Sequence, residues 1–158
     1  MRNKIAYALF AAVFLGLVFY GKTVQAQDMA EIHVLDFGEF ALLDNGSVHT
    51  IVVTPANGVT YDPALIRGIQ AQRGEYLLTG LPPSEALVIT LNNTVDLSHN
   101  GLGGGTLFTI GAYTTNNPST NGSGDATLYI GATLSTSGTG AGYIDGPYSG
   151  SVDLTINF

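Results

Sequence analysis

The sequence predicts an all-β domain built from antiparallel strands. Apolar residues recur at every second position in several stretches, and these stretches are rich in β-branched and aromatic residues. Gly, Asn, Ser and Pro interrupt them at short intervals, whereas apolar residues at helical spacing are nearly absent. Seven or more short strands around one core favour an immunoglobulin-like β-sandwich, with a small barrel as the alternative.

The first 26 residues have the pattern of a signal peptide. Arg2 and Lys4 precede an apolar run over residues 5–20, and Val24-Gln25-Ala26 ends in a small residue suited to cleavage before Gln27. A retained membrane anchor would need a longer run, of roughly 20 apolar residues. We therefore expect an exported protein at the cell surface, outside the cell or in the periplasm. Residues 1–26 would be removed, leaving a single domain over 27–158 with no membrane span.

The expected strands follow the alternating stretches in order. Ile32 and Val34 lie on one parity and Leu35 and Phe37 on the other, which predicts either a bulge in the first strand or a strand buried on both sides. The predicted strands cover residues 32–37, 48–54, 75–79, 87–91, 106–111, 126–134 and 148–158, with shorter elements at 59–61 and 66–71.

Turn residues separate these strands. Asn45-Gly46 and Asn57-Gly58 adopt positive φ at low cost and are predicted to close hairpins, and Pro82-Pro83 cannot continue a strand ladder. Three stretches lack large apolar side chains and are predicted to be exposed loops, the middle one mobile. They are "SHNGLGGG" (98–105), "TTNNPSTNGSG" (114–124) and "STSGTGAG" (135–142).

The last predicted strand carries the candidate site. Apolar residues and Gly alternate there with Ser149, Ser151, Asp153, Thr155 and Asn157 up to the last residue printed. This alternation predicts a paired strand with one face toward the core. We assign strand pairing or assembly to the residues of that parity, which are Tyr148, Gly150, Val152, Leu154, Ile156 and Phe158.

Composition excludes several classes of function. Arg67 and Arg73 are the only Lys or Arg after residue 26, against twelve Asp and Glu, which gives 2 − 12 = −10. A surface with this negative charge repels phosphate backbones and anionic lipid. We therefore expect neither nucleic acid nor an anionic membrane surface as a partner. The chain contains no Cys, which excludes disulfides, thiol nucleophiles and thiolate metal sites.

No residue pattern predicts a catalytic, cofactor or metal site. His33, His49 and His99 are too scattered for a metal site or a triad, and we expect them to be exposed. "GLGGGT" (101–106) lacks the Lys and the following helix of a phosphate-binding loop. Acids at strand ends, oxygen-rich turns at 44–47 and 121–125, and glycosylation-like triplets at Asn45, Asn92 and Asn121 are interpreted as ordinary surface features.

Several stretches also carry a family resemblance. "LDFGEF" (35–40), "EYLLTGLPP" (75–83), "GSGDATLYIGATLS" (122–135) and "GPYSGSVDLTINF" (146–158) resemble an exported bacterial family, domain-of-unknown-function family 4402. That family is similar in appearance to fimbrial and spore-coat-U-type pilin subunits. The resemblance implies a β-sandwich with a structural role at the cell surface and no enzymatic activity.

Two functions follow as hypotheses. The first is a secreted structural or adhesive pilin-like subunit that pairs strands with itself or with other surface subunits. Only "QDMAE" separates Gln27 from "IHVLDF", so a donated strand would have to be that first strand itself, unless the domain completes its own sheet. The alternative is a glycan- or protein-binding module, which exposed aromatic rings at Tyr113, Tyr143 or Tyr148 on one rim would favour.

Overall fold

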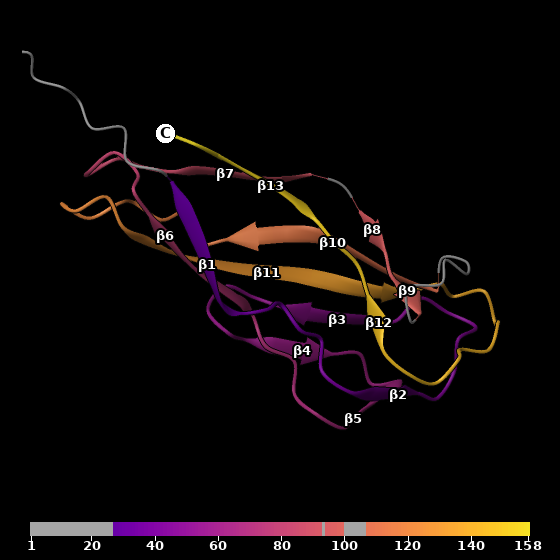
Figure 1. The fold of residues 1–158 in the computed structure, drawn as a ribbon. Helices are drawn as coiled ribbons and strands as arrows, with labels where there is room; N and C mark the ends of the chain where they lie inside the picture. Colours follow the sequence, from indigo (N-terminus) through magenta and orange to yellow (C-terminus); the bar gives the residue numbers. More distant parts are fainter. Residues whose placement is uncertain (1–26, 93, 100–106) are drawn as a thin grey trace, which may run out of the picture.

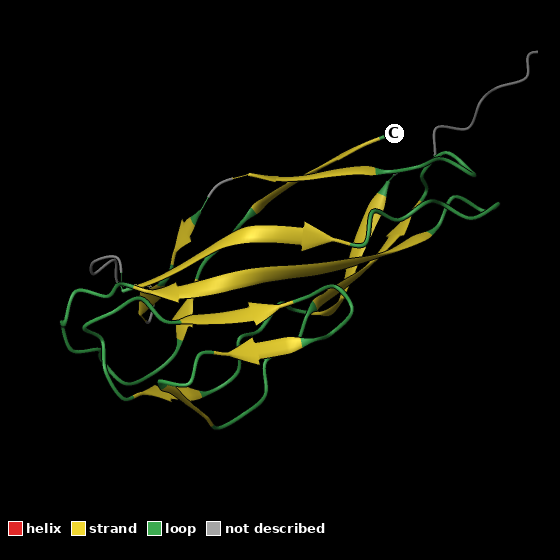
Figure 2. Cartoon of the chain, turned by 180° about the vertical axis from the view of Figure 1, so that it is seen from behind, coloured by secondary structure: helices red, strands yellow, loops and turns green. Residues whose placement is uncertain are grey.

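The computed structural model describes residues 27–92, 94–99 and 107–158, which form strands, turns and loops (Figures 1 and 2). Over these ranges no helix has the length and apolarity to cross a membrane. The described strands are β1 (Asp28–His33), β2 (Phe40–Leu42), β3 (Thr50–Val53), β4 (Val59–Tyr61), β5 (Leu65–Arg67), β6 (Gly74–Thr79), β7 (Val88–Asn92), β8 (Val95–Asp96), β9 (Ser98–His99), β10 (Phe108–Thr115), β11 (Ala126–Thr136), β12 (Tyr148–Ser149) and β13 (Asp153–Asn157).

Most of these strands form one antiparallel sheet around β11. Along one edge β11 pairs with β10, and β10 pairs in turn with β8. Along the other edge β11 pairs first with β6, which carries β1, and then with β3, which carries β4. The sheet is curled into a half-barrel, and the predicted all-β, antiparallel class is confirmed.

Three two-stranded ribbons complete the fold: β12–β9, β13–β7 and β2–β5. In Figure 1, β12 and β13 cross in front of β10 and β11. In the reverse view of Figure 2, β10 and β11 lie nearest the viewer. β12 and β13 therefore lie over one side of the large sheet.

Gly131 marks the point where β11 changes partners. Ile130 is paired with β6 and Ala132 with β3. A Cβ atom at Gly131 would collide with the carbonyl oxygen of Val53 and the Cα atom of Thr54. A Gly at this position therefore permits the close approach of the two backbones.

The buried side chains form two clusters, and β11 contributes to both. Its inward-facing Leu128, Ile130, Ala132 and Leu134 are at most 5% exposed, as their shared parity predicts. The first cluster contains Phe37, Ile51, Val53, Leu65, Ala71, Leu97, Phe108, Ala132 and Leu134. The second contains Leu78, Leu81, Leu87, Ala126, Leu128 and Ile130.

The first strand differs from its predicted range. β1 covers Asp28–His33, and its register with β6 shifts between Glu31 and His33, which is earlier in the chain than the change of parity between Val34 and Leu35. Residues 34–37 were expected to continue the strand, but only Asp36 forms an isolated bridge, with Gln72. The chain then turns at Gly38, where φ is +73° and the backbone N–H donates to the Asp36 carboxylate.

Of the two predicted Asn-Gly hairpin turns, one is confirmed. Asn57 has a φ of 64° and lies in the turn that joins β3 to β4. Asn45-Gly46 closes no hairpin, because β2 pairs with β5 and β3 pairs with β4. Asn45 is instead buried, and its amide binds the segment over residues 138–143, which no local turn signal indicates.

The stretch over residues 114–124, predicted to be an exposed and mobile loop, is only partly exposed. β10 continues to Thr115, and Pro118, Thr120 and Gly124 are buried. The Thr120 backbone N–H donates to the Glu85 carbonyl at 2.8 Å, and its hydroxyl donates to the Pro82 carbonyl at 2.7 Å. Backbone hydrogen bonds join this loop to residues 81–87, and the composition of the loop does not indicate them. Residues 100–106, with "GLGGGT", lie outside the described residues.

Candidate assembly surface

The C-terminal segment forms two strands where one continuous strand was expected. β12 pairs with β9, whereas β13 pairs with β7, and the chain crosses between these ribbons over residues 150–152. A Cβ atom at Gly150 would lie 2.7 Å from Cγ1 of Val95 and 2.9 Å from Cδ2 of Leu97. The chain therefore passes directly over these side chains, which explains why a residue without a side chain stands at the break.

β13 and β7 form a regular antiparallel ribbon. Their register runs without interruption from the pair Asp153–Asn92 to the pair Asn157–Val88. Leu154 and Ile156 are half-buried and pack against the second cluster, together with Ile89 and Leu91 of β7. The other residues of β13 are exposed, so the ribbon has one apolar face on the core and one polar face outside.

The residues predicted for strand pairing are divided between two places. Leu154 and Ile156 lie together on the second cluster, whereas Tyr148 packs against the first. Val152 and Phe158 are exposed by 37% and 53%, at the two ends of β13. The sixth residue, Gly150, forms the crossing described above. The apolar residues therefore keep the same parity, although the chain passes from the β12–β9 ribbon to the β13–β7 ribbon.

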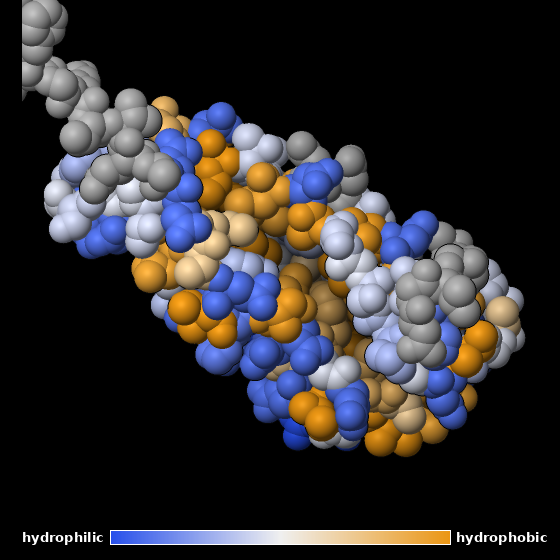
Figure 3. Space-filling model, viewed as in Figure 1, coloured by the Kyte–Doolittle hydropathy of each residue, from blue (hydrophilic) through white to orange (hydrophobic). Residues whose placement is uncertain are grey.

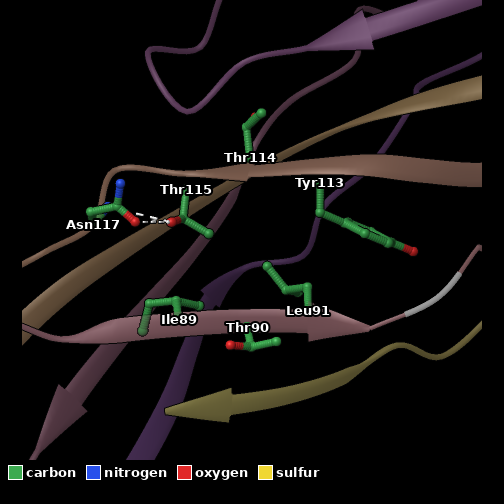
Figure 4. Close-up of a pocket in the computed structure, with 7 residues that line it drawn as sticks. All are labelled: Ile89, Thr90, Leu91, Tyr113, Thr114, Thr115 and Asn117. Carbon is green, nitrogen blue, oxygen red and sulfur yellow. Dashed lines mark hydrogen bonds between the residues drawn. The ribbon is translucent and has the colours of Figure 1, made fainter. Parts of the chain in front are cut away.

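A groove separates β7 from β10. It has a volume of about 430 Å³ and is lined by Ile89, Thr90, Leu91, Tyr113, Thr114, Thr115 and Asn117, none of them charged (Figure 4). β10 bends here, because its register with β11 shifts between Gly111 and Thr114 and Ala112 has a φ of 48°. Burial raises the pKa of Tyr113. Sequence reasoning missed this groove, since it depends on two strands diverging in space.

The face seen in Figure 1 is hollowed along its middle, and apolar side chains form the floor of the hollow (Figure 3). β1 and β13 both lie on this face, but neither pairs with the other: β1 pairs with β6 and β13 pairs with β7. Each of them therefore has one edge without a partner strand among the described residues.

The free edges in the described part of the chain are not equally protected. β1 carries Asp28 and Glu31 and is interrupted by its bulge. The edge strands β2, β4, β5 and β8 have only two or three residues each. The outer edge of β13 has five regular residues without a bulge, Pro or Lys, and Asp153 is its single charge. Because bulges, short length and charges are what block sheet addition, β13 is less protected than β1, β2, β4, β5 or β8.

The polar residues considered for chemistry lie apart from one another. His49 was expected to be exposed, but its side chain is only 13% exposed and its Nδ1 atom lies 3.0 Å from Oδ1 of Asp62. The oxygen-rich turns use their side chains internally: Asp44 accepts from Gly46 N, and Asn121 accepts from Ser123 N and Asp125 N. No group of three or more His, Cys, Asp or Glu is placed to hold a metal ion in the described ranges.

Of the three tyrosines that could mark a glycan site, two are used inside the fold. The Tyr143 ring stacks on Phe108 with centroids 4.4 Å apart, and its hydroxyl donates to Oδ1 of Asn45 at 2.8 Å. The Tyr148 ring meets Phe108 edge-on, and its hydroxyl donates to the Ile144 carbonyl. Tyr113 lines the groove beside β7. The three rings therefore do not form one exposed rim.

The fold and this surface define a class: an all-β protein of antiparallel sheets with an accessible strand edge. The chain belongs to the family Domain of unknown function (DUF4402), which it matches over residues 25–158. This confirms the predicted family, while its likeness to pilin subunits remains a prediction. No curated protein and no solved structure matches the chain.

Proposed function

We propose that this protein is a secreted, non-catalytic structural or adhesive subunit of the bacterial cell surface. In this proposal a signal peptide over residues 1–26 is removed on export. The remaining domain is a pilin-like, immunoglobulin-like sandwich that joins copies of itself or other surface subunits by strand pairing. The observation that carries the proposal is the unprotected outer edge of β13.

Strand pairing at this edge has a clear physical basis. An added strand forms main-chain hydrogen bonds with the free N–H and C=O groups of β13, and its alternate side chains reach the apolar face. Leu154 and Ile156 attach β13 to the second cluster, so the edge is held in place before a partner arrives. A pre-ordered edge lowers the entropy cost of association.

The charge of the chain supports a directional contact of this kind. Residues 27–158 carry a formal charge of −10, which opposes non-specific association between copies. β13 contributes only Asp153 to that charge, and the lining of the neighbouring groove contributes none. Few charges therefore oppose strand pairing at this edge.

The assembly state of the exported protein tests this proposal. We expect association that increases with concentration in size-exclusion chromatography, and particles larger than a monomer in negative-stain microscopy. The double variant Asp153→Lys/Asn157→Lys should suppress both, because Lys on an edge strand opposes sheet addition. Thr60→Lys on the exposed face of β4 is the control and should assemble like wild type.

A strict monomer at every concentration would contradict the proposal. Equal assembly of wild type and the double β13 variant would also contradict it, since association would then use another surface. N-terminal sequencing of the same preparation tests export: we expect the chain to start at or within a few residues of Gln27. Intact Met1 in a membrane fraction would be the opposite result.

A further inference from the structure

We propose that the partner of β13 is β13 of a second copy, paired antiparallel about a two-fold axis through Thr155. This inference rests on the proposed function and names the partner for it. The two ribbons would join into a four-stranded sheet in the order β7, β13, β13 of the partner, β7 of the partner. A closed two-fold contact of this type uses the same surface on both copies.

The sequence of β13 suits this register. With Thr155 opposite Thr155 of the partner, Leu154 lies opposite the partner's Ile156, and Asp153 lies opposite the partner's Asn157. Paired residues lie on the same side of a sheet, so the apolar rows of the two copies join and no like charges face each other. An axis through Asp153 would instead set two carboxylates side by side. The axis through Thr155 also pairs all five residues of the strand.

The exposed apolar residues at the ends of β13 gain partners in the same register. Val152 and Phe158 flank the strand and are exposed by 37% and 53%. They share the parity of Leu154 and Ile156, and Val152 would lie opposite Phe158 of the partner. The row of paired side chains on the core side would then run through Val152, Leu154, Ile156 and Phe158 of both copies.

The neighbouring edges are less suited to this contact. The free edge of β7 faces β10 across the groove, so a partner strand would have to enter between them (Figure 4). The free edge of β1 has its bulge and two acids, and a bulge twists an edge away from a flat partner. The β13 edge is regular and does not line the groove beside β10.

The contact should be weak in dilute solution. Five to seven residues a side are well below the roughly 20–30 of a standard stable interface, so we expect association that depends on concentration. A covalent trap is therefore the suitable probe, and the chain contains no Cys that could interfere.

The first experiment uses two single-Cys variants, one with the Cys on β13 and one with it on β7. Each is produced from the full chain and purified after export. Thr155→Cys places its thiols at the axis, where paired Cα atoms lie within the ~7 Å that a disulfide spans. Thr90→Cys is the matched control, because Thr90 lies next to Thr155 in the ribbon and is also exposed. In the proposed dimer the Thr90→Cys thiols of the two copies would be three strand spacings apart, about 14 Å, which is too far for a disulfide.

We expect Thr155→Cys to form disulfide-linked dimers at least tenfold faster than Thr90→Cys under mild oxidation, as seen on a non-reducing gel. A mixture of Asp153→Cys and Asn157→Cys proteins should give the mixed dimer in preference to either homodimer, which tests the register. Equal rates for Thr155→Cys and Thr90→Cys would overturn the inference. Preferential homodimers of Asp153→Cys would overturn the register.

A charge exchange tests the contact without a covalent bond. Thr155→Lys and Thr155→Glu should each dimerise about two- to fivefold more weakly than wild type, since like charges meet at the axis. Mixing the two variants should restore association, whereas mixing Thr90→Lys with Thr90→Glu should change nothing.

These outcomes separate the inference from the proposed function. Suppose that wild type assembles and that the double Lys variant does not. If Thr155→Cys then fails to cross-link, and mixing Thr155→Lys with Thr155→Glu fails to restore association, β13 pairs with a different strand. The inference would then fail and the proposed function would stand. If wild type never assembles, both fail.

Discussion

Leu154 of β13 lies directly opposite Leu91 of β7, and both side chains pack against the second cluster around the fully buried Leu128. This pair anchors the C-terminal ribbon to the large sheet. It also separates the two roles of β13, since Leu154 faces the core while Asp153 and Thr155 face outward. Stability and assembly can therefore be changed independently.

The first prediction concerns this separation. Leu154→Asp removes half-buried apolar area and places a carboxylate against the second cluster, so we expect a loss of about 2–3 kcal/mol in the free energy of unfolding. Asp153→Asn, one residue away on the exposed face, should stay within about 0.5 kcal/mol of wild type. Chemical denaturation of both variants measures the difference. Equal stability of the two variants would mean that β13 is not part of the core.

The second prediction concerns Tyr143 and Asn45, which join segments 98 residues apart. The Tyr143 hydroxyl donates to Oδ1 of Asn45 at 2.8 Å, and it accepts from the Ser137 backbone N–H at 3.1 Å. Tyr143→Phe leaves these part-buried groups without that partner and should cost about 1–3 kcal/mol.

Tyr148→Phe is the matched control for this prediction, because it also deletes a hydroxyl from a ring that packs on Phe108. The Tyr148 hydroxyl makes one exposed hydrogen bond, to the Ile144 carbonyl, so its loss should cost less than that of Tyr143. Thermal melting of both variants decides the order. A larger effect at Tyr148 would show that the Asn45 network contributes little.

The third prediction concerns Gly131. In Gly131→Ala the added Cβ meets backbone atoms of Val53 and Thr54, which cannot rotate away. We expect at least about 2 kcal/mol of destabilisation, because the pairing of β11 with β3 must open to admit it. Gly122→Ala is the control: nothing lies within 4 Å of the new Cβ, so its melting temperature should match wild type. A stable Gly131→Ala protein would contradict this close approach of β3 and β11.

The fourth prediction concerns pH. The hydrogen bond from Ala64 N, followed by the contact with His49, lowers the pKa of Asp62 in the folded protein. A carboxylate with a lowered folded pKa stabilises the fold above its unfolded pKa, ~3.9, and this contribution is lost as the pH falls through the folded pKa. Stability from Asp62 should therefore be complete at neutral pH and disappear in acid.

Asp62→Asn isolates this charge, since an Asn side chain can still accept from Ala64 N. We expect the variant to melt below wild type at pH 7, with the gap closing as the pH falls below about 4. Melting curves at intervals from pH 7 to pH 2 measure this gap. A constant gap over that range would show that the ionised carboxylate does not matter.

The sequence by itself determined the class of fold and much of the local structure. Alternation in β11 placed Leu128, Ile130, Ala132 and Leu134 in the core, because successive side chains of a strand point to opposite faces. Asn57-Gly58 indicated the turn between β3 and β4, because Asn and Gly tolerate positive φ.

Only the tertiary structure decided which strands meet. The alternation from Tyr148 to Phe158 predicts one strand, yet the chain changes ribbon at Gly150, where a Cβ atom would collide with Val95 and Leu97. The loop over 114–124 is joined by hydrogen bonds to residues 81–87, and Asn45 is buried against a segment more than 90 residues later. The local sequence pattern shows which side of a strand is apolar. Which strands pair, and which edges stay free, depends on contacts between residues distant in sequence. For this reason the open edge of β13 became visible only in the folded chain.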